Sequence, residues 1–242
     1  MSFCHSLWWV VDILSSDNTG VVEQLRAVQD DPVRLLRKAH ELLGNRLAIM
    51  SSFGAESALL LAFVAEADPD MKVLFLNTGK HFPQTLTYRR ELADVLGLTN
   101  VEDIGPSPEQ VSDRDPTGEL WAFDPDACCN LRKVEPLRVA SLPYDVLVTG
   151  RKRGQAATRA TMTIVEERDD GQLRINPLAF WSAQDIAAEM QRRSLPPHPL
   201  VAEGYLSIGC APCTRPVDGR EDARSGRWSG LNKTECGIHI AG

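Results

Sequence analysis

The chain has 242 residues, of which 43% are hydrophobic and 24% are charged. This size and composition suit a folded domain with a sizeable core, and they exclude collagen, a coiled coil and a disordered chain. Acidic residues outnumber basic residues by 33 to 26, which gives a formal net charge of -7. Because a negatively charged protein repels polyanions, we expect no nucleic acid partner.

The N-terminal segment, residues 1–20, matches no pattern and has no assignment. Its apolar stretch at residues 7–14 contains Asp12 and is too short to cross a bilayer. The segment also lacks the basic start and the small-residue cleavage site of a secretory signal. We therefore expect a cytoplasmic protein with no membrane partner.

The following residues alternate between helical and strand-like patterns. Apolar residues at helical spacing predict one or two amphipathic helices over residues 21–43. An apolar run at 46–54 that ends in small residues predicts a strand and a tight loop, followed by a helix over 55–67. The pattern recurs as a strand at 72–77, a helix opened by proline at 83–96 and a strand at 100–104.

The second half continues this alternation. It predicts a helix over 124–141, a buried strand over 144–149, a hairpin of 163–167 with 173–176, and a helix over 182–193. Alternating strands and helices predict an α/β fold, a single domain over residues 21–209 with a mainly parallel sheet flanked by helices. Residues 210–242 are expected to form a loop-rich C-terminal tail whose order depends on ligands.

A loop of small and polar residues, Ser-Ser-Phe-Gly-Ala-Glu-Ser at 51–57, lies between the first predicted strand and its helix. Backbone N–H groups and hydroxyls converge at such a helix start and can hold a phosphate-like group. The loop has neither the Gly-Lys-Ser/Thr of a Walker loop nor a dinucleotide glycine fingerprint. On this motif alone, an ordinary strand-to-helix turn is an equal alternative.

Six cysteines are present, and in a reducing compartment clustered thiols more often bind metal or perform chemistry than form disulfides. Cys128 and Cys129 are adjacent, and Cys210 and Cys213 form a Cys-x-x-Cys pair. Four thiolates suit tetrahedral zinc or a four-iron cluster. Neighbouring helical residues point about 100° apart, which favours a cluster because its separate irons can each take one thiolate. Four buried cysteines without a ligand are the remaining alternative.

Basic residues of this acidic protein gather in two groups. Residues 151–153 with Arg159 follow a predicted strand, Arg224 and Arg227 lie in the tail, and Lys133 follows the first cysteine pair. A basic run is usually a solvated face. Because these residues follow strand ends or flank cysteines, where a small dianion needs bidentate donors, we favour a functional role.

Cys236 lies near the C-terminus and has no partner cysteine nearby in the sequence. A nucleophile needs the thiolate form, which the adjacent Glu235 disfavours unless cations compensate. Lys233, His239 and the arginines are available for that compensation. The alternative is a surface thiol without a role, and Cys4 fits that description.

Taken together, motifs over residues 47–239 resemble those of the assimilatory sulfonucleotide reductases, specifically the cluster-containing adenylyl-sulfate (APS) reductases. Beside the loop at 51–57, the matching segments are Phe-Leu-Asn-Thr-Gly at 75–79, Asp-Ala-Cys-Cys-Asn-Leu-Arg-Lys-Val-Glu-Pro at 126–136, Gly-Cys-Ala-Pro-Cys-Thr at 209–214, Gly-Arg-Trp at 226–228 and Lys-Thr-Glu-Cys-Gly-Ile-His at 233–239. The resemblance implies a modified PP-loop fold of the adenine nucleotide alpha-hydrolase type and one [4Fe-4S] cluster per chain.

The resemblance also implies a reaction, in which the sulfate of APS is reduced to sulfite and AMP is released during sulfate assimilation and cysteine biosynthesis. Cys236 matches the nucleophile that forms a thiosulfonate, which reduced thioredoxin or a glutaredoxin-like donor resolves. A homo-oligomer is also expected. The cluster ligands match Cys128, Cys129, Cys210 and Cys213. The nucleotide and anion positions match Ser51, Ser52, Phe53, Gly54, Ser57, Asn77, Thr78, Gly79, Lys133, Arg159, Arg224, Arg227 and His239.

Asn77 departs from the family pattern, because many relatives have Asp there, and this alters the expected contacts with adenosine. Three alternative functions stay open. The same chemistry on the 3′-phosphorylated substrate (PAPS) is one. A PP-loop ATPase, such as a tRNA-thiolating enzyme with a cluster, would carry a Ser-Gly-Gly-x-Asp-Ser loop, which Phe53, Ala55 and Glu56 do not match. An iron–sulfur sensor that binds a nucleotide leaves Cys236 without a role.

Overall fold

The structure is a computed structural model and describes residues 19–218, 222–230, 233 and 235–238. Most of the unassigned N-terminal segment, with Cys4, and also His239 lie outside these described residues. The helices are α1 (Thr19–Arg26), α2 (Pro32–Leu43), α3 (Ser57–Ala67), α4 (Pro83–Leu96), α5 (Pro108–Arg114), α6 (Leu120–Phe123), α7 (Pro125–Cys129), α8 (Glu135–Ser141) and α9 (Ala183–Arg192). The strands are β1 (Leu47–Ser51), β2 (Val73–Leu76), β3 (Val101–Ile104), β4 (Val146–Thr149), β5 (Val165–Glu167) and β6 (Leu173–Ile175).

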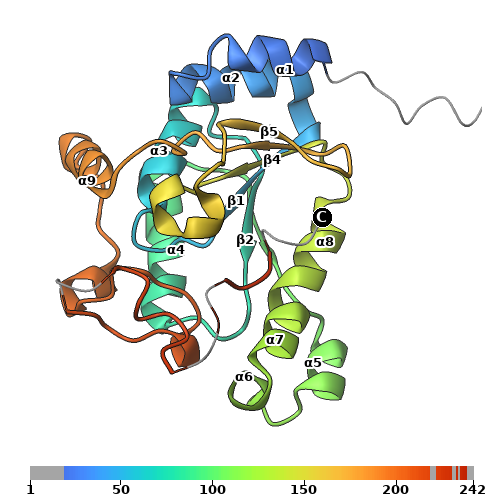
Figure 1. The fold of residues 1–242 in the computed structure, drawn as a ribbon, viewed down its shortest axis with the longest axis vertical. Coiled ribbons are helices and arrows are strands. Elements are labelled where there is room, and N and C mark those ends of the chain that lie inside the picture. Colours follow the sequence, from blue (N-terminus) through green and yellow to red (C-terminus); the bar gives the residue numbers. More distant parts are fainter. Residues whose placement is uncertain (1–18, 219–221, 231–232, 234, 239–242) are drawn as a thin grey trace, which may run out of the picture.

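The strands form one sheet in the order β3-β2-β1-β4-β6-β5, with helices on both faces (Figure 1). Neighbouring strands are parallel from β3 to β6, and only β5 at the edge is antiparallel to β6. The α/β fold with a mainly parallel sheet is therefore confirmed. The predicted hairpin exists as β5 and β6, and it extends the sheet beside β4.

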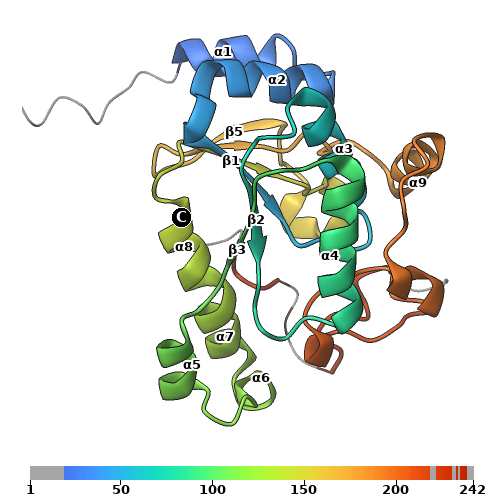
Figure 2. The same ribbon diagram turned by 180° about the vertical axis from the view of Figure 1, so that it is seen from behind.

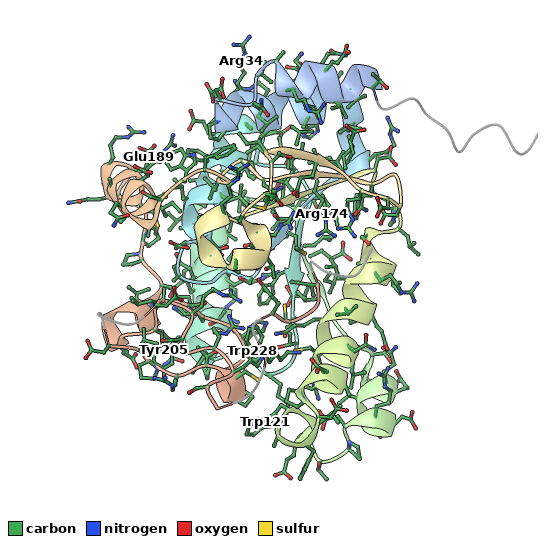
Figure 3. The ribbon with its side chains drawn as sticks, in the orientation of Figure 1. Arg34, Trp121, Arg174, Glu189, Tyr205 and Trp228 are labelled. Carbon is green, nitrogen blue, oxygen red and sulfur yellow. The ribbon has the colours of Figure 1, made fainter. Side chains whose placement is uncertain are left out.

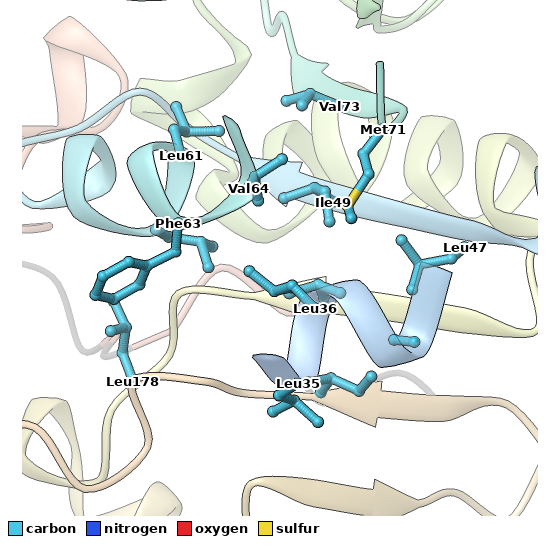
Figure 4. Close-up of a cluster of buried hydrophobic side chains, with 14 of the residues drawn as sticks. Leu35, Leu36, Leu47, Ile49, Leu61, Phe63, Val64, Met71, Val73 and Leu178 are labelled. Carbon is cyan, nitrogen blue, oxygen red and sulfur yellow. The ribbon is translucent and has the colours of Figure 1, made fainter. Parts of the chain in front are cut away.

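The strands alternate their side chains between two cores, as the pleat requires. In β1, Leu47 and Ile49 belong to a core covered by α1, α2, α3, α4 and α9, whereas Ala48 and Met50 belong to a second core covered by α8. Figure 2 shows α4 and α8 on opposite sides of the strands, and Figure 4 shows side chains of α2, α3 and β1 in the first core. Strands β1, β2 and β4 are buried on both faces, which explains why their sequences are almost wholly apolar.

Helix α3 is apolar around most of its circumference, which is typical of a buried helix. It begins at Ser57 and not at residue 55, because residues 54–57 form a closed turn. The Ser57 N–H donates to the Gly54 carbonyl at 3.1 Å, and the Gly54 N–H donates to the Ser57 hydroxyl at 2.9 Å. Among the described residues, no helix combines the length and the apolar character needed to cross a bilayer.

The helix predicted over residues 124–141 is interrupted. A π-helical turn, Asn130–Val134, separates α7 from α8, and Pro136 follows in the first turn of α8. Proline has no N–H with which to continue the regular hydrogen-bond ladder, which accounts for the irregular turn before it. The turn carries Lys133 directly after the cysteines of α7.

Phe53 anchors the loop after β1. Its side chain is 0% exposed, and its ring meets that of Phe75 on β2 edge to face at 5.5 Å. We expect Phe53→Ala to lower the free energy of unfolding by about 3–5 kcal/mol, because a large buried ring is lost. Phe123→Ala is the matched control, since Phe123 is 80% exposed, and it should change stability by less than about 0.5 kcal/mol. Urea denaturation measures both variants, and equal midpoints would contradict the anchoring role.

Candidate active site

A pocket of about 360 Å³ lies at the carboxyl ends of the parallel strands. Its floor includes Ser51 at the end of β1, Thr78 after β2 and Thr149 at the end of β4. The chain leaves β1 for β2 on one side, and β4 lies on the other side, so the strand order reverses here. Ligands of open α/β sheets bind at such a point.

The predicted nucleotide loop contributes most of its residues to this pocket. Ser51, Ser52, Gly54 and Ser57 line it, whereas the side chain of Phe53 points into the core. Phe53 also has a positive φ of 49°, an uncommon conformation that bends the loop sharply after β1. The loop therefore presents small and hydroxyl-bearing groups to the pocket at the start of α3.

Of the three predicted substrate-binding residues in the turn after β2, one lines the pocket and two do not. Thr78 lines the pocket. The side chain of Asn77 turns towards β3, where its Nδ2 donates to Asp103 at 3.0 Å, while its Oδ1 accepts from the Gly79 N–H at 3.1 Å. Asn77 and Gly79 thus shape the turn and are not among the described residues that line the pocket.

The structure brings the four predicted cluster cysteines together from distant parts of the chain. Cys128 and Cys129 come from α7, and Cys210 and Cys213 come from the start and end of a short turn in the tail. All four are free thiols. Burial raises the pKa of Cys128 to about 11, and the charges of the other three cysteines act in the same direction. Each cysteine is therefore within electrostatic reach of Cys128.

The chemistry of this group fits an iron–sulfur cluster or zinc, because both are held by four thiolates. The Thr78 hydroxyl lies 3.3 Å from the Cys210 sulfur. Within the described ranges of the chain, no three His, Cys, Asp or Glu side chains are grouped so that they could hold a metal ion. The four thiols are gathered, but they are not closed around one point.

Lys133 interacts electrostatically both with these cysteines and with Cys236. Its side chain is buried, and burial alone opposes its charge, yet the thiolate charges of Cys210, Cys236 and Cys129 outweigh burial and raise the pKa of Lys133. A lysine in this position stays protonated. It provides a positive charge beside both the cysteine group and the predicted nucleophile.

The tail is held in place by a short backbone pairing around Trp228. Thr214 bridges to Arg227, and the Trp228 N–H donates to the Cys213 carbonyl at 3.0 Å. The Arg227 guanidinium lies 4.6 Å from the centre of the Trp228 ring, a cation–π distance. It also packs on Gly209, where a Cβ atom would lie 2.2 Å from an Arg227 nitrogen. Glycine at 209 therefore lets Arg227 lie beside Cys210. Figure 3 shows Trp228 in the lower half of the molecule, above Trp121.

The segment with Cys236 docks over the same pocket. Glu235 forms ion pairs with Arg159 and Arg224, so its negative charge beside Cys236 is compensated as expected. Lys233 is paired with Asp126 of α7 instead. Ile238 packs against the core under α8. These contacts place Cys236 in the pocket lining.

The structure thus gathers Lys133, Arg159, Arg224, Arg227 and Cys236 in one pocket. Arg151 and Lys152, which belong to the basic group predicted to be functional, and Glu56 of the 51–57 loop also line the pocket. The sequence analysis missed His81, which lines the pocket as well. His81 follows β2, and it bridges through its backbone to Cys210. Burial lowers the pKa of His81, and its ring nitrogen Nε2 contacts the Leu76 carbonyl at 2.9 Å.

Comparisons with known proteins agree with this geometry. Residues 46–216 match the phosphoadenosine phosphosulfate reductase domain. An adenosine 5′-phosphosulfate reductase of Mesorhizobium japonicum is 52% identical over 206 residues, which cover 85% of this chain and 81% of that protein. A phosphoadenosine 5′-phosphosulfate reductase of Gloeobacter violaceus is 39% identical over 92% of this chain and 95% of its own length. The crystal structure of a PAPS reductase from Candida auris in complex with phosphate has a TM-score of 0.66 and 26% identity, and it covers 80% of this chain and 97% of that one.

Proposed function

This chain belongs to the phosphoadenosine phosphosulfate reductase family, and we propose that it reduces adenylyl sulfate to sulfite and AMP in sulfate assimilation. The observation that carries this proposal is the meeting of Cys236 with Lys133, Arg159, Arg224 and Arg227 in one pocket. A thiol nucleophile among four cations suits a substrate whose reacting group is a dianion. The relative from Mesorhizobium japonicum, named an adenosine 5′-phosphosulfate reductase, supports APS as the substrate.

The loop after β1 and the cations of the pocket bind different parts of the substrate. The N–H groups and hydroxyls at the start of α3 receive the nucleotide part, as helix starts do for phosphates. The lysine and the arginines neutralise the phosphosulfate group. Their charge makes AMP a better leaving group.

The reaction then proceeds in two displacements. The Cys236 thiolate attacks the sulfur of APS, the bond from sulfur to the bridging oxygen breaks, and AMP leaves with the electron pair. A thiolate of reduced thioredoxin, or of a glutaredoxin-like donor, next attacks the Cys236 sulfur and expels sulfite. The donor's second thiol resolves the mixed disulfide. The donor is thereby oxidised by two electrons, and Cys236 returns as a thiol.

We also propose that Cys128, Cys129, Cys210 and Cys213 hold one [4Fe-4S] cluster. When bound, the cluster supplies structural order and an electrostatic field to the site, and it carries no electrons in the reaction. The Thr78 hydroxyl contacts the sulfur of Cys210, and Lys133 interacts electrostatically with Cys210 and Cys129, which supports this proposal. Two of the cysteines come from α7 and two from the tail, so a cluster bound to all four would fix the wall on which Arg227 and Cys236 lie.

A turnover assay tests the proposed function. Anaerobically purified protein, incubated with APS and reduced thioredoxin, should release sulfite and AMP in equal amounts. A PP-loop ATPase would instead consume ATP without releasing sulfite from APS. A nucleotide-binding sensor would bind APS without turnover, and either of these outcomes would exclude the reductase.

We expect APS to be preferred over PAPS. The 3′-phosphate of PAPS needs a further cation, and among the described lining residues the two remaining cations are already paired. Arg151 pairs with Glu166 at 2.5 Å, and Lys152 pairs with Glu56. The value of kcat/KM for APS should exceed that for PAPS by about tenfold or more, the equivalent of one lost contact of about 1.4 kcal/mol. Equal or better kinetics with PAPS would reverse the choice of substrate.

A further inference from the structure

The carboxylate of Glu235 is bound by Arg159 and Arg224, two of the arginines that we propose bind the substrate's anion. Nη2 of Arg159 donates to both of its oxygens, at 2.7 and 2.9 Å, and Nη2 of Arg224 lies 3.4 Å from one of them. The side chains of Arg159 and Glu235 are only 8% and 7% exposed. Charge-assisted hydrogen bonds shielded from water in this way are stronger than ion pairs on the surface.

The Arg159 guanidinium is already held in position by its neighbours. Arg159 ends a short turn after β4, Ala157–Arg159, and its other terminal nitrogen donates to Gln155 at 2.6 Å. Its guanidinium is thus fixed from one side by Gln155 and from the other by Glu235. An incoming phosphosulfate group needs the same donors that Glu235 takes. Substrate and Glu235 therefore cannot both hold Arg159.

We propose that Glu235 is an internal competitor of the substrate, which holds Arg159 and Arg224 until the substrate's anion displaces it. The proposal rests on the proposed function for the identity of the substrate. A phosphosulfate group carries two negative charges against one on the carboxylate, so the exchange favours the substrate. Part of the binding free energy is used to separate Glu235 from the arginines, and this lowers the affinity for substrate and product alike.

The position of Glu235 in the chain links this exchange to the nucleophile. Glu235 directly precedes Cys236, so its release from the arginines moves the backbone that carries the thiol. When product leaves, the carboxylate recaptures the two guanidinium groups. Glu235 is a positioning residue in this account, because it acts on the reaction through Arg159, Arg224 and Cys236.

The variant Glu235→Gln tests the competition, because it keeps the size of the side chain and removes its charge. Calorimetric titration should show about tenfold tighter binding of both AMP and inorganic pyrophosphate to the variant than to the unaltered protein. In steady state, KM for APS and kcat should fall together, since product leaves more slowly. Glu235→Ala should also tighten binding. Glu235→Asp keeps the charge and should stay near the unaltered protein, as should the control Glu203→Gln at an exposed position.

Unchanged or weaker binding of pyrophosphate to both Glu235→Gln and Glu235→Ala would overturn the proposal, because Glu235 would then merely hold the arginines in order. Visible absorption and circular dichroism check that the variants keep their fold. Pyrophosphate titration requires no turnover. Tighter binding in a protein that does not reduce APS would reject the proposed function and keep the competition. Normal affinity in a variant that reduces APS would reject the competition alone.

Discussion

Replacing Cys236 with Ser is expected to abolish release of AMP and sulfite while AMP binding and the four-cysteine site persist. Attack on the sulfur of APS needs a soft anionic nucleophile, and a serine hydroxyl stays protonated at neutral pH. Cys236 lies in the pocket lining beside Lys133, and the charge of its thiolate acts on both Lys133 and Arg227. Loss of a nucleophile that forms a covalent intermediate should lower kcat by at least about 10⁴-fold.

The native protein provides the complementary test. With APS and no thioredoxin, we expect a single turnover and an adduct on Cys236 of about 80 Da, the mass of an added SO₃ group, as covalent catalysis with a trapped intermediate requires. Mass spectrometry of the C-terminal peptide measures it. Cys4→Ser is the matched control and should keep both turnover and adduct. Normal turnover by Cys236→Ser, or an adduct on Cys4, would reject the mechanism.

The parallel sheet could be predicted from the sequence because its strands β1, β2 and β4 are buried on both faces. The run at residues 73–76 is apolar without alternation and is followed by a helix, as expected for a strand in a sheet covered on two sides. The short helices α5 and α6 were not predicted. The first carried a signal, since Ser107 and Gln110 form a capping box in the structure. The second has four residues, too few for any helical period to show.

Many residues of the candidate site could be predicted from the sequence, but which of them form ion pairs with one another could not. Cysteines and arginines stand out by type and by their place after strands. The contact of Glu235 with Arg159 joins residues 76 positions apart, and no local pattern specifies it. For Phe53, the motif predicted a substrate-binding residue, but the structure places the side chain elsewhere. Phe53 lies inside a substrate-loop motif, yet its aromatic side chain belongs to the core, because packing against Phe75 decided its direction.

Loss of a predicted cluster ligand is the second large effect that we expect. Cys128→Ser and Cys213→Ser should each yield colourless protein without iron and without APS turnover. Cys128 comes from α7 and Cys213 from the tail, so a cluster bound to both ties these parts together. Binding of the metal stabilises the folded arrangement of the segments that it joins. Loss of the metal should therefore disorder the residues that face the substrate. Iron and sulfide analysis with visible and Mössbauer spectra measures the loss directly.

The variant Cys236→Ser is the matched control for this experiment, because it makes the same substitution at a cysteine outside the ligand set. It should keep four irons per chain and the brown colour while it lacks turnover, whereas the ligand variants should lack both, since a four-iron cluster needs its four thiolates. The backbone N–H of Trp228 donates to the Cys213 carbonyl, so loss of the cluster should move the Trp228 segment, and tryptophan fluorescence should change in Cys213→Ser and not in Cys236→Ser. A colourless native protein with stoichiometric zinc and full activity would overturn the cluster. Retained turnover by iron-free Cys213→Ser would separate the cysteine group from catalysis, because Arg227 and Cys236 would then hold their places without it.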